Sequence, residues 1–121
     1  MSAPSLEGTW ELIRAELGGE AAPQMLAHNI TLELAAGEYT VRFAGEIADR
    51  GTYTPDPAPG INRLTLTGVE GPSAGRTIPC IYQLAGDRLR VCYGLDGRVP
   101  TAFATSTGQQ HYLASYRRRA G

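Results

Sequence analysis

The sequence predicts an all-β domain, an eight-stranded antiparallel up-and-down barrel with a short helical segment between its first and second strands. Three observations predict it. One stretch, residues 78–93, has the pattern of a β-hairpin, and about eight alternating segments follow one another without the spacing of βαβ units. The 15 glycines and 8 prolines are spaced between apolar runs, as expected for short strands joined by turns. Eight tilted strands close into a barrel about one small ligand wide, whereas the alternative, a two-sheet sandwich, needs longer crossover loops.

The hairpin is the most clearly specified element. Its two apolar runs alternate strictly and comprise Ile78, Cys80, Tyr82 and Leu84, then Leu89, Val91 and Tyr93. If Gly86 and Asp87 form the loop, Tyr82 faces Val91 and every apolar residue of the two runs lies on one side. A slip of one residue would turn one apolar set toward water, so the pattern fixes the register.

Size and composition indicate one domain over residues 1–121, with 1–5 and 118–121 as tails. Disorder is not expected, because 42% of the residues are hydrophobic and the net charge is −1. The near-neutral charge argues against nucleic-acid binding, and no apolar run approaches the roughly 20 residues of a membrane span. The start, MSAPSLEG, has no secretory signal, which predicts a cytoplasmic protein as written, or an exported one if a signal was removed.

Residues 6–17 are expected to form the long first strand. Trp10 and Leu12 share one face, but the next apolar residues, from Ile13 onward, take the other. This change of parity predicts a bulge or bend near Leu12 and Ile13, while a helix is the rival interpretation. Residues 19–29 follow as a short helical segment, with Pro23 at its first position. The remaining strands are expected at 30–34, 39–43, 47–54, 61–67, 78–84, 89–93 and 110–117.

The two cysteines are predicted to carry thiols and no disulfide. In the hairpin register Cys80 lies on the apolar face and Cys92 on the opposite face, so their Cβ atoms diverge. A disulfide needs them to converge to about 3.5–4.5 Å. The histidines, His28 and His111, lack metal-ligand spacing, so we expect no metal and no cofactor.

Gly8-Thr9-Trp10 at the head of the first strand, with an arginine late in the chain, is similar to the lipocalin signature. A longer series, including Gly51-Thr52-Tyr53 and the run from Ile81 through Gly86-Asp87 to Cys92, resembles a family of small, uncharacterised lipocalin-like (calycin-like) domains frequent in planctomycetes and other environmental bacteria. The chain departs from the family pattern at three positions, with Asn62 for an acidic residue, Gln83 for a glutamate and an inserted Val99. The resemblance implies the fold and supplies no chemistry.

Trp10 is predicted to plug one end of the barrel, with Arg117 over its indole face and Arg118 as the alternative partner. A cation–π contact of this kind contributes about 0.5–2 kcal/mol.

The candidate ligand-binding residues are Tyr39, Phe43, Tyr53, Tyr82, Val91 and Tyr93. Several inward tyrosines indicate a partly polar interior, because buried hydroxyl groups need partners. We therefore expect a domain that binds a small apolar or amphipathic molecule inside the barrel. The alternative is a structural or protein-interaction domain with a filled core. No nucleophile motif is present, so an enzyme is not expected.

Overall fold

The computed structural model describes residues 6–21, 29–56, 62–71, 74–103 and 111–119. In these ranges the chain forms nine strands and no helix. The strands are β1 (Gly8–Leu17), β2 (Glu20–Ala21), β3 (Ile30–Ala35), β4 (Glu38–Phe43), β5 (Glu46–Asp56), β6 (Asn62–Glu70), β7 (Thr77–Ala85), β8 (Arg88–Gly94) and β9 (His111–Arg118).

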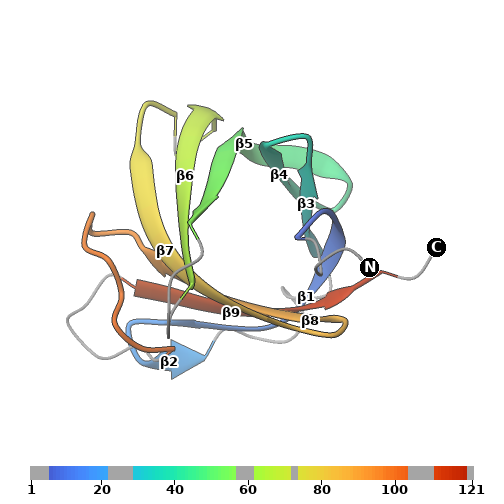
Figure 1. Cartoon of the computed structure of the whole chain (residues 1–121). Coiled ribbons are helices and arrows are strands. Elements are labelled where there is room, and N and C mark those ends of the chain that lie inside the picture. Colours follow the sequence, from blue (N-terminus) through green and yellow to red (C-terminus); the bar gives the residue numbers. More distant parts are fainter. Residues whose placement is uncertain (1–5, 22–28, 57–61, 72–73, 104–110, 120–121) are drawn as a thin grey trace.

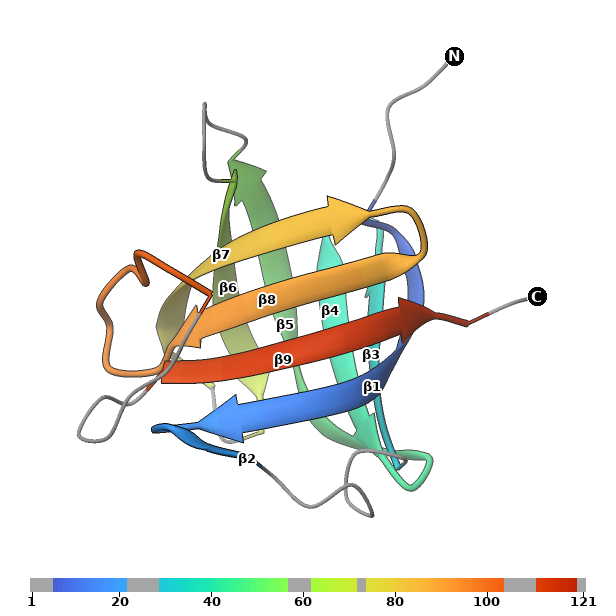
Figure 2. The same ribbon diagram turned by 90° about the horizontal axis from the view of Figure 1, so that it is seen from below.

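The eight long strands form a closed antiparallel barrel with up-and-down order (Figure 1). Each strand from β3 to β8 pairs with the next one along the chain, and β1 pairs with both β3 and β9. The short strand β2 pairs only with the end of β1. Figure 2 shows β7, β8, β9 and β1 side by side across one face of the wall. The predicted barrel is therefore confirmed, and the architecture is consistent with a lipocalin-like fold.

The hairpin has the predicted register. Tyr82 pairs with Val91, Cys80 with Tyr93 and Ala85 with Arg88. Gly86 adopts a positive φ of 62°, which a two-residue loop of this kind requires and glycine tolerates without strain. Alternation along the two strands was sufficient to fix this pairing because only one face of the ribbon contributes to the barrel core.

Strand β1 contains the predicted bulge. Leu12 pairs with Tyr116 and Arg14 with Ser115, so Ile13 is an extra residue in β1. From this point the side chains of β1 reverse their facing, and Ala15 is buried in the core while Arg14 is exposed. A single inserted residue has this effect because successive side chains of a strand point to opposite faces.

Most strands begin or end one to three residues from the expected bounds, and β6 and β9 are two examples. Strand β6 continues to Glu70, three residues beyond its expected end at 67, because a register shift between Arg50 and Gly51 lets Arg50 pair with Glu70. Strand β9 runs through Arg118, one residue into the expected tail. The helical segment predicted at 19–29 begins with strand β2, and residues 22–28 lie outside the described residues.

The core lies inside the barrel and follows the inward positions of every long strand. It is built from one contiguous cluster of buried apolar and aromatic side chains: Leu6, Trp10, Leu12, Ala15, Leu32, Leu34, Tyr39, Tyr53, Leu64, Leu66, Ile78, Cys80, Tyr82, Leu89, Val91, Tyr93, Ala114 and Tyr116. Cys80 belongs to this cluster and Cys92 faces outward, and neither forms a disulfide, as predicted.

Candidate ligand-binding site in the barrel

Trp10 is fully buried where β1 enters the barrel. Its indole Nε1 donates a hydrogen bond to the carbonyl of Leu6 at 2.9 Å, and the guanidinium carbon of Arg118 lies 4.3 Å from the ring centroid. Gly8 has a φ of 139°, and a Cβ at this position would lie 2.6 Å from Nη1 of Arg118. The glycine thus makes room for the arginine that covers the tryptophan.

The arginine over Trp10 is Arg118, the alternative that the sequence left open, and the assignment to Arg117 was wrong. Strand β9 places the buried Ala114 and Tyr116 toward the core, so Arg118 shares their face and Arg117 points outward, exposed. The register agrees, because Trp10 pairs with Arg118 and Glu11 with Arg117.

A cluster of tyrosines fills part of the interior between β8 and β9. The hydroxyl groups of Tyr93 and Tyr116 are hydrogen-bonded at 2.7 Å, and the rings of Tyr93 and Tyr112 lie 5.5 Å apart between centroids. Burial raises the pKa of Tyr93 and Tyr116 well above the ordinary tyrosine value, and it also raises the pKa of Tyr112. These phenols are therefore neutral at physiological pH and act as hydrogen-bonding groups rather than as bases.

A carboxylate also faces the interior. Asp49 pairs with Val41 of β4 and is two residues from Gly51, which pairs with the buried Tyr39. The Tyr39 ring packs against Gly51, and its hydroxyl group donates a hydrogen bond to Oδ2 of Asp49 at 3.3 Å. Glycine at position 51 permits this arrangement, since a larger side chain would occupy the place of the ring.

The predicted ligand-binding residues separate into two groups. Five of them are buried together in the core cluster: Tyr39, Tyr53, Tyr82, Val91 and Tyr93. Phe43 stands apart at the end of β4, where 42% of its surface is exposed. It pairs with Ile30 and has the same facing as the buried Tyr39, so it lies at the rim of the barrel interior. Leu17, which follows the inward Ala15 on β1, is likewise exposed.

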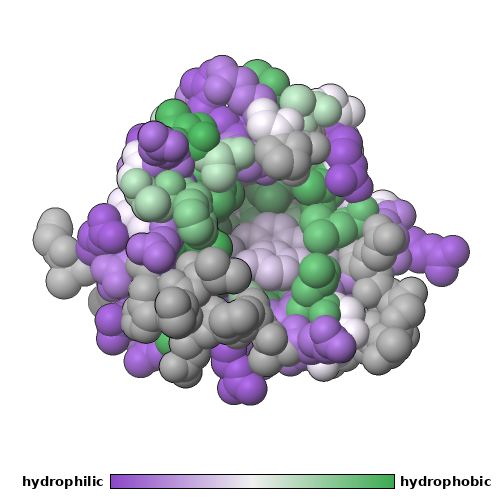
Figure 3. Space-filling view, turned by 180° about the vertical axis from the view of Figure 1, so that it is seen from behind, coloured by the Kyte–Doolittle hydropathy of each residue, from purple (hydrophilic) through white to green (hydrophobic). Residues whose placement is uncertain are grey.

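The space-filling view shows a hollow in the surface of the barrel (Figure 3). Hydrophobic residues form most of its wall, and its floor has the pale colour of weakly hydrophilic residues. An apolar wall with a few polar groups is the usual composition of a small-molecule site.

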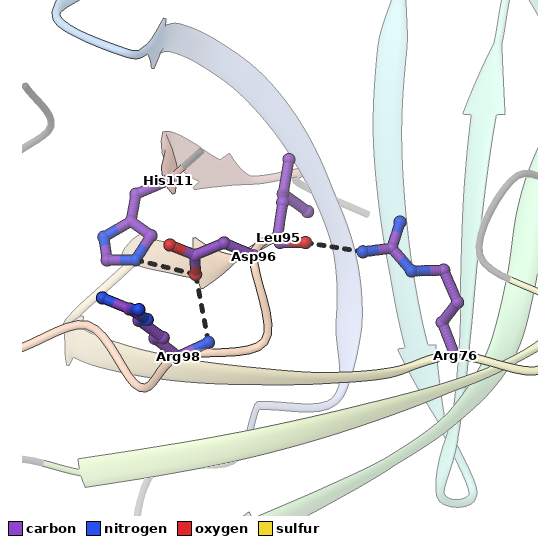
Figure 4. Close-up of polar contacts among 5 residues, drawn as sticks. All are labelled: Arg76, Leu95, Asp96, Arg98 and His111. Carbon is purple, nitrogen blue, oxygen red and sulfur yellow. Dashed lines mark hydrogen bonds and ion pairs between the residues drawn. The ribbon is translucent and has the colours of Figure 1, made fainter. Parts of the chain in front are cut away.

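A polar cluster follows β8, outside the barrel wall. His111 Nε2 lies 3.2 Å from Oδ1 of Asp96, which also accepts a hydrogen bond from the backbone N–H of Arg98 (Figure 4). This N–H, and secondarily His111, lowers the pKa of Asp96. The carbonyl of Arg98 packs against Gly94, and Arg76 donates to the carbonyl of Leu95. These contacts anchor the turn after β8 to the neighbouring chain segments.

Sequence reasoning missed Asp49 and the tyrosines of the last strand as interior residues. Asp49 alternates with Gly51 and Tyr53, which was an available signal for its inward facing. Tyr112 and Tyr116 also alternate with Ala114 along β9, but their meeting with Tyr93 depends on the pairing of β8 with β9.

The fold and the interior define the class of this protein as a small closed β-barrel with an aromatic, partly polar core. Comparison with models of known protein families finds no match, and comparison with curated proteins finds none either. Among the described residues, no helix is long and apolar enough to cross a membrane. The same residues contain no group of three or more His, Cys, Asp or Glu side chains arranged to hold a metal ion.

Proposed function

We propose that this chain is a lipocalin-like binding domain that holds a small, largely apolar or amphipathic molecule in the interior of the barrel. The observation that carries the proposal is the exposure of Phe43 on the face that is otherwise the core. An inward apolar side chain left 42% exposed at a strand end is what an open barrel mouth presents to a ligand.

The polar groups of the interior limit the kind of ligand. Tyr39 and Asp49 form a hydrogen-bonded pair on the same inward face as Phe43, and the buried Tyr93–Tyr116 pair is a second polar group of the interior. A ligand with an apolar body and one polar group would bury its body against the aromatic side chains. Its polar group would bond to a tyrosine hydroxyl or to the carboxylate of Asp49, which compensates for the loss of hydration.

Native mass spectrometry of the purified protein is the first test, because a retained ligand adds a defined mass. In parallel, 8-anilinonaphthalene-1-sulfonate, an amphipathic fluorescent probe, is titrated into the protein. We expect saturable binding that Phe43→Ala weakens several-fold and that Tyr82→Ala abolishes in a folded barrel. Ile47→Ala is the matched control, since Ile47 is 50% exposed on the neighbouring strand and pairs with the outward-facing Arg42.

The alternative is a structural or protein-interaction domain, and the complete burial of Tyr39 and Val91 favours it over a wide cavity. It predicts no added mass and no difference between Phe43→Ala and Ile47→Ala in probe binding. That combined result would overturn the proposal of a ligand in the barrel.

A further inference from the structure

Four polar side chains form a row across the outer surface of the barrel. Arg14 of β1 pairs with Ser115 of β9, which pairs with Arg90 of β8, which pairs with Gln83 of β7. Directly opposed residues have Cβ atoms about 4.5–5.5 Å apart. The hydroxyl group of Ser115 therefore stands between two guanidinium groups that can both reach a ligand above it. We propose that this row is an oxyanion-binding site, with Ser115 at its centre and Arg14 and Arg90 on either side.

The bulge in β1 creates this arrangement. Without the extra residue, Ile13 would stand opposite Ser115, and Arg14 would have the inward facing of Trp10 and Leu12. Bulges commonly re-aim side chains at binding sites. Here the bulge keeps an arginine out of the apolar core and places it beside Ser115.

Arg90 is held in place before any ligand binds. Its Nη2 donates a hydrogen bond to Oε1 of Gln83, and its guanidinium carbon lies 4.3 Å from the centre of the Phe103 ring. A guanidinium group has five N–H donors in a fixed plane, so these contacts leave donors for an anion. Because the side chain is already ordered, less conformational entropy is lost when the anion binds.

The surface is hollowed on both sides of Ser115. One groove of about 250 Å³ is lined by Ile13, Arg88, Arg90 and Ser115 among others, and a second of about 230 Å³ is lined by Arg14, Glu16, Arg90 and Ser115 among others. Arg90 and Ser115 thus border both grooves. The first groove places the exposed side chain of Ile13 near the arginines, which suits an anion that carries an apolar substituent.

Positive charge predominates around the row. Two further outward arginines, Arg88 and Arg117, pair with each other across β8 and β9. Of the nearby acidic residues, Glu11 is bonded to Arg119 at 3.0 Å, and Asp87 is 3.9 Å from Arg88. Arg14 borders the second groove together with Glu16, so the anion is expected directly above Ser115, between Arg14 and Arg90, with an apolar substituent in the first groove. The ligand class is a phosphate or phosphate ester, whose oxygens match the guanidinium donors.

The test is isothermal titration calorimetry with inorganic phosphate and with phenyl phosphate, at fixed ionic strength in a cationic buffer. We expect saturable binding, which Arg14→Gln and Arg90→Gln each weaken about five- to tenfold, since each removes a charge-assisted hydrogen bond. Arg42→Gln is the control, because it removes the same charge from the outward face of β4. Tighter binding of phenyl phosphate indicates an ester as ligand, and equal binding indicates the free anion.

Saturable binding that Arg42→Gln weakens as much as Arg14→Gln would overturn the site and indicate attraction to net charge alone. Absence of binding of both compounds would also overturn it. If Arg90→Gln disturbs the fold through the loss of its Phe103 contact, Arg14→Gln gives the decisive result, because Arg14 is exposed. The row faces away from the interior, so either result is independent of ligand binding inside the barrel.

Discussion

Arg118 lies over the indole ring of Trp10, 4.3 Å from the ring centroid to the guanidinium carbon. The two residues come from the last and first long strands of the chain, and their contact accompanies the pairing that closes the barrel. Backbone hydrogen bonds also connect the end of β9 to its neighbours. The N–H of Arg118 donates to the carbonyl of Asp87 at 2.7 Å, and the N–H of Arg119 donates to the carbonyl of Thr9 at 2.8 Å. The pairing that closes the wall and the burial of Trp10 therefore involve the same few residues.

Arg118→Ala is expected to lower the free energy of unfolding by about 1–2 kcal/mol, because it removes the cation–π contact of a half-buried guanidinium group and its hydrogen bond to the carbonyl of Glu7. Arg117→Ala, one residue earlier and exposed, is expected to change it by less than about 0.5 kcal/mol. Urea unfolding followed by Trp10 fluorescence measures both variants. Equal losses in the two variants would mean that Arg118 does not stabilise this end of the barrel.

Gly8→Ala is expected to cost more than Gly86→Ala. Both glycines have positive φ, but a Cβ at Gly8 also meets the Arg118 guanidinium, whereas at Gly86 it meets nothing within 4 Å. Backbone strain costs about 1–2 kcal/mol in the left-handed region of Gly86 and about 1–3 kcal/mol at the φ of 139° of Gly8. The excess at Gly8 is expected to shrink in an Arg118→Ala background, which a double-mutant cycle of unfolding free energies measures. An excess that persists there would have to come from the backbone and not from the arginine.

Tyr93→Phe and Tyr116→Phe are each expected to destabilise the fold by about 1–3 kcal/mol, since each leaves a buried hydroxyl group without its partner. The double variant removes both hydroxyl groups and is expected to be more stable than the sum of the single losses predicts. Chemical denaturation of the four proteins gives the coupling energy. Strict additivity would show that the two hydroxyl groups do not depend on each other.

Stability is expected to fall as the pH rises above about 10, the ordinary tyrosine pKa. Burial raises the pKa of Tyr93 and Tyr116 in the folded state, so above that pH the unfolded chain loses protons that the folded chain retains. Each such group lowers the free energy of unfolding by up to about 1.4 kcal/mol per pH unit there, and has no effect below pH 10. Unfolding curves between pH 7 and 11 measure how steeply the free energy of unfolding falls with pH. This slope should flatten in the double phenylalanine variant, and an unchanged slope would contradict this account.

Cys80 and Cys92 are expected to react with a thiol reagent such as Ellman's reagent only as fast as the protein unfolds. Both side chains are buried, and burial raises the pKa of the Cys80 thiol, which suppresses the reactive thiolate. Labelling in 8 M urea, where both thiols react rapidly, is the control. Rapid labelling of either cysteine in native buffer would show that the sheet around it opens locally.

Much of the barrel could be predicted from local patterns. Alternation placed Tyr82 and Val91 on one face and opposite each other, and the change of parity after Leu12 located the bulge. These features are local because strand side chains alternate with period two, and a tight turn fixes the register of the strands it joins. The predicted end of β6 was wrong, because pairing with β5 extends the strand through Gly68–Glu70.

The sequence by itself determined the apolar face of the clearly alternating strands and the pairing of the β7–β8 hairpin. Only the tertiary structure decided that Arg118 rather than Arg117 meets Trp10, and that Arg14, Ser115 and Arg90 stand in one row. These relationships cross the seam between β1 and β9, where no turn joins the strands. Their register follows from how the whole wall closes, to which every strand contributes, and a local pattern carries no information about that closure.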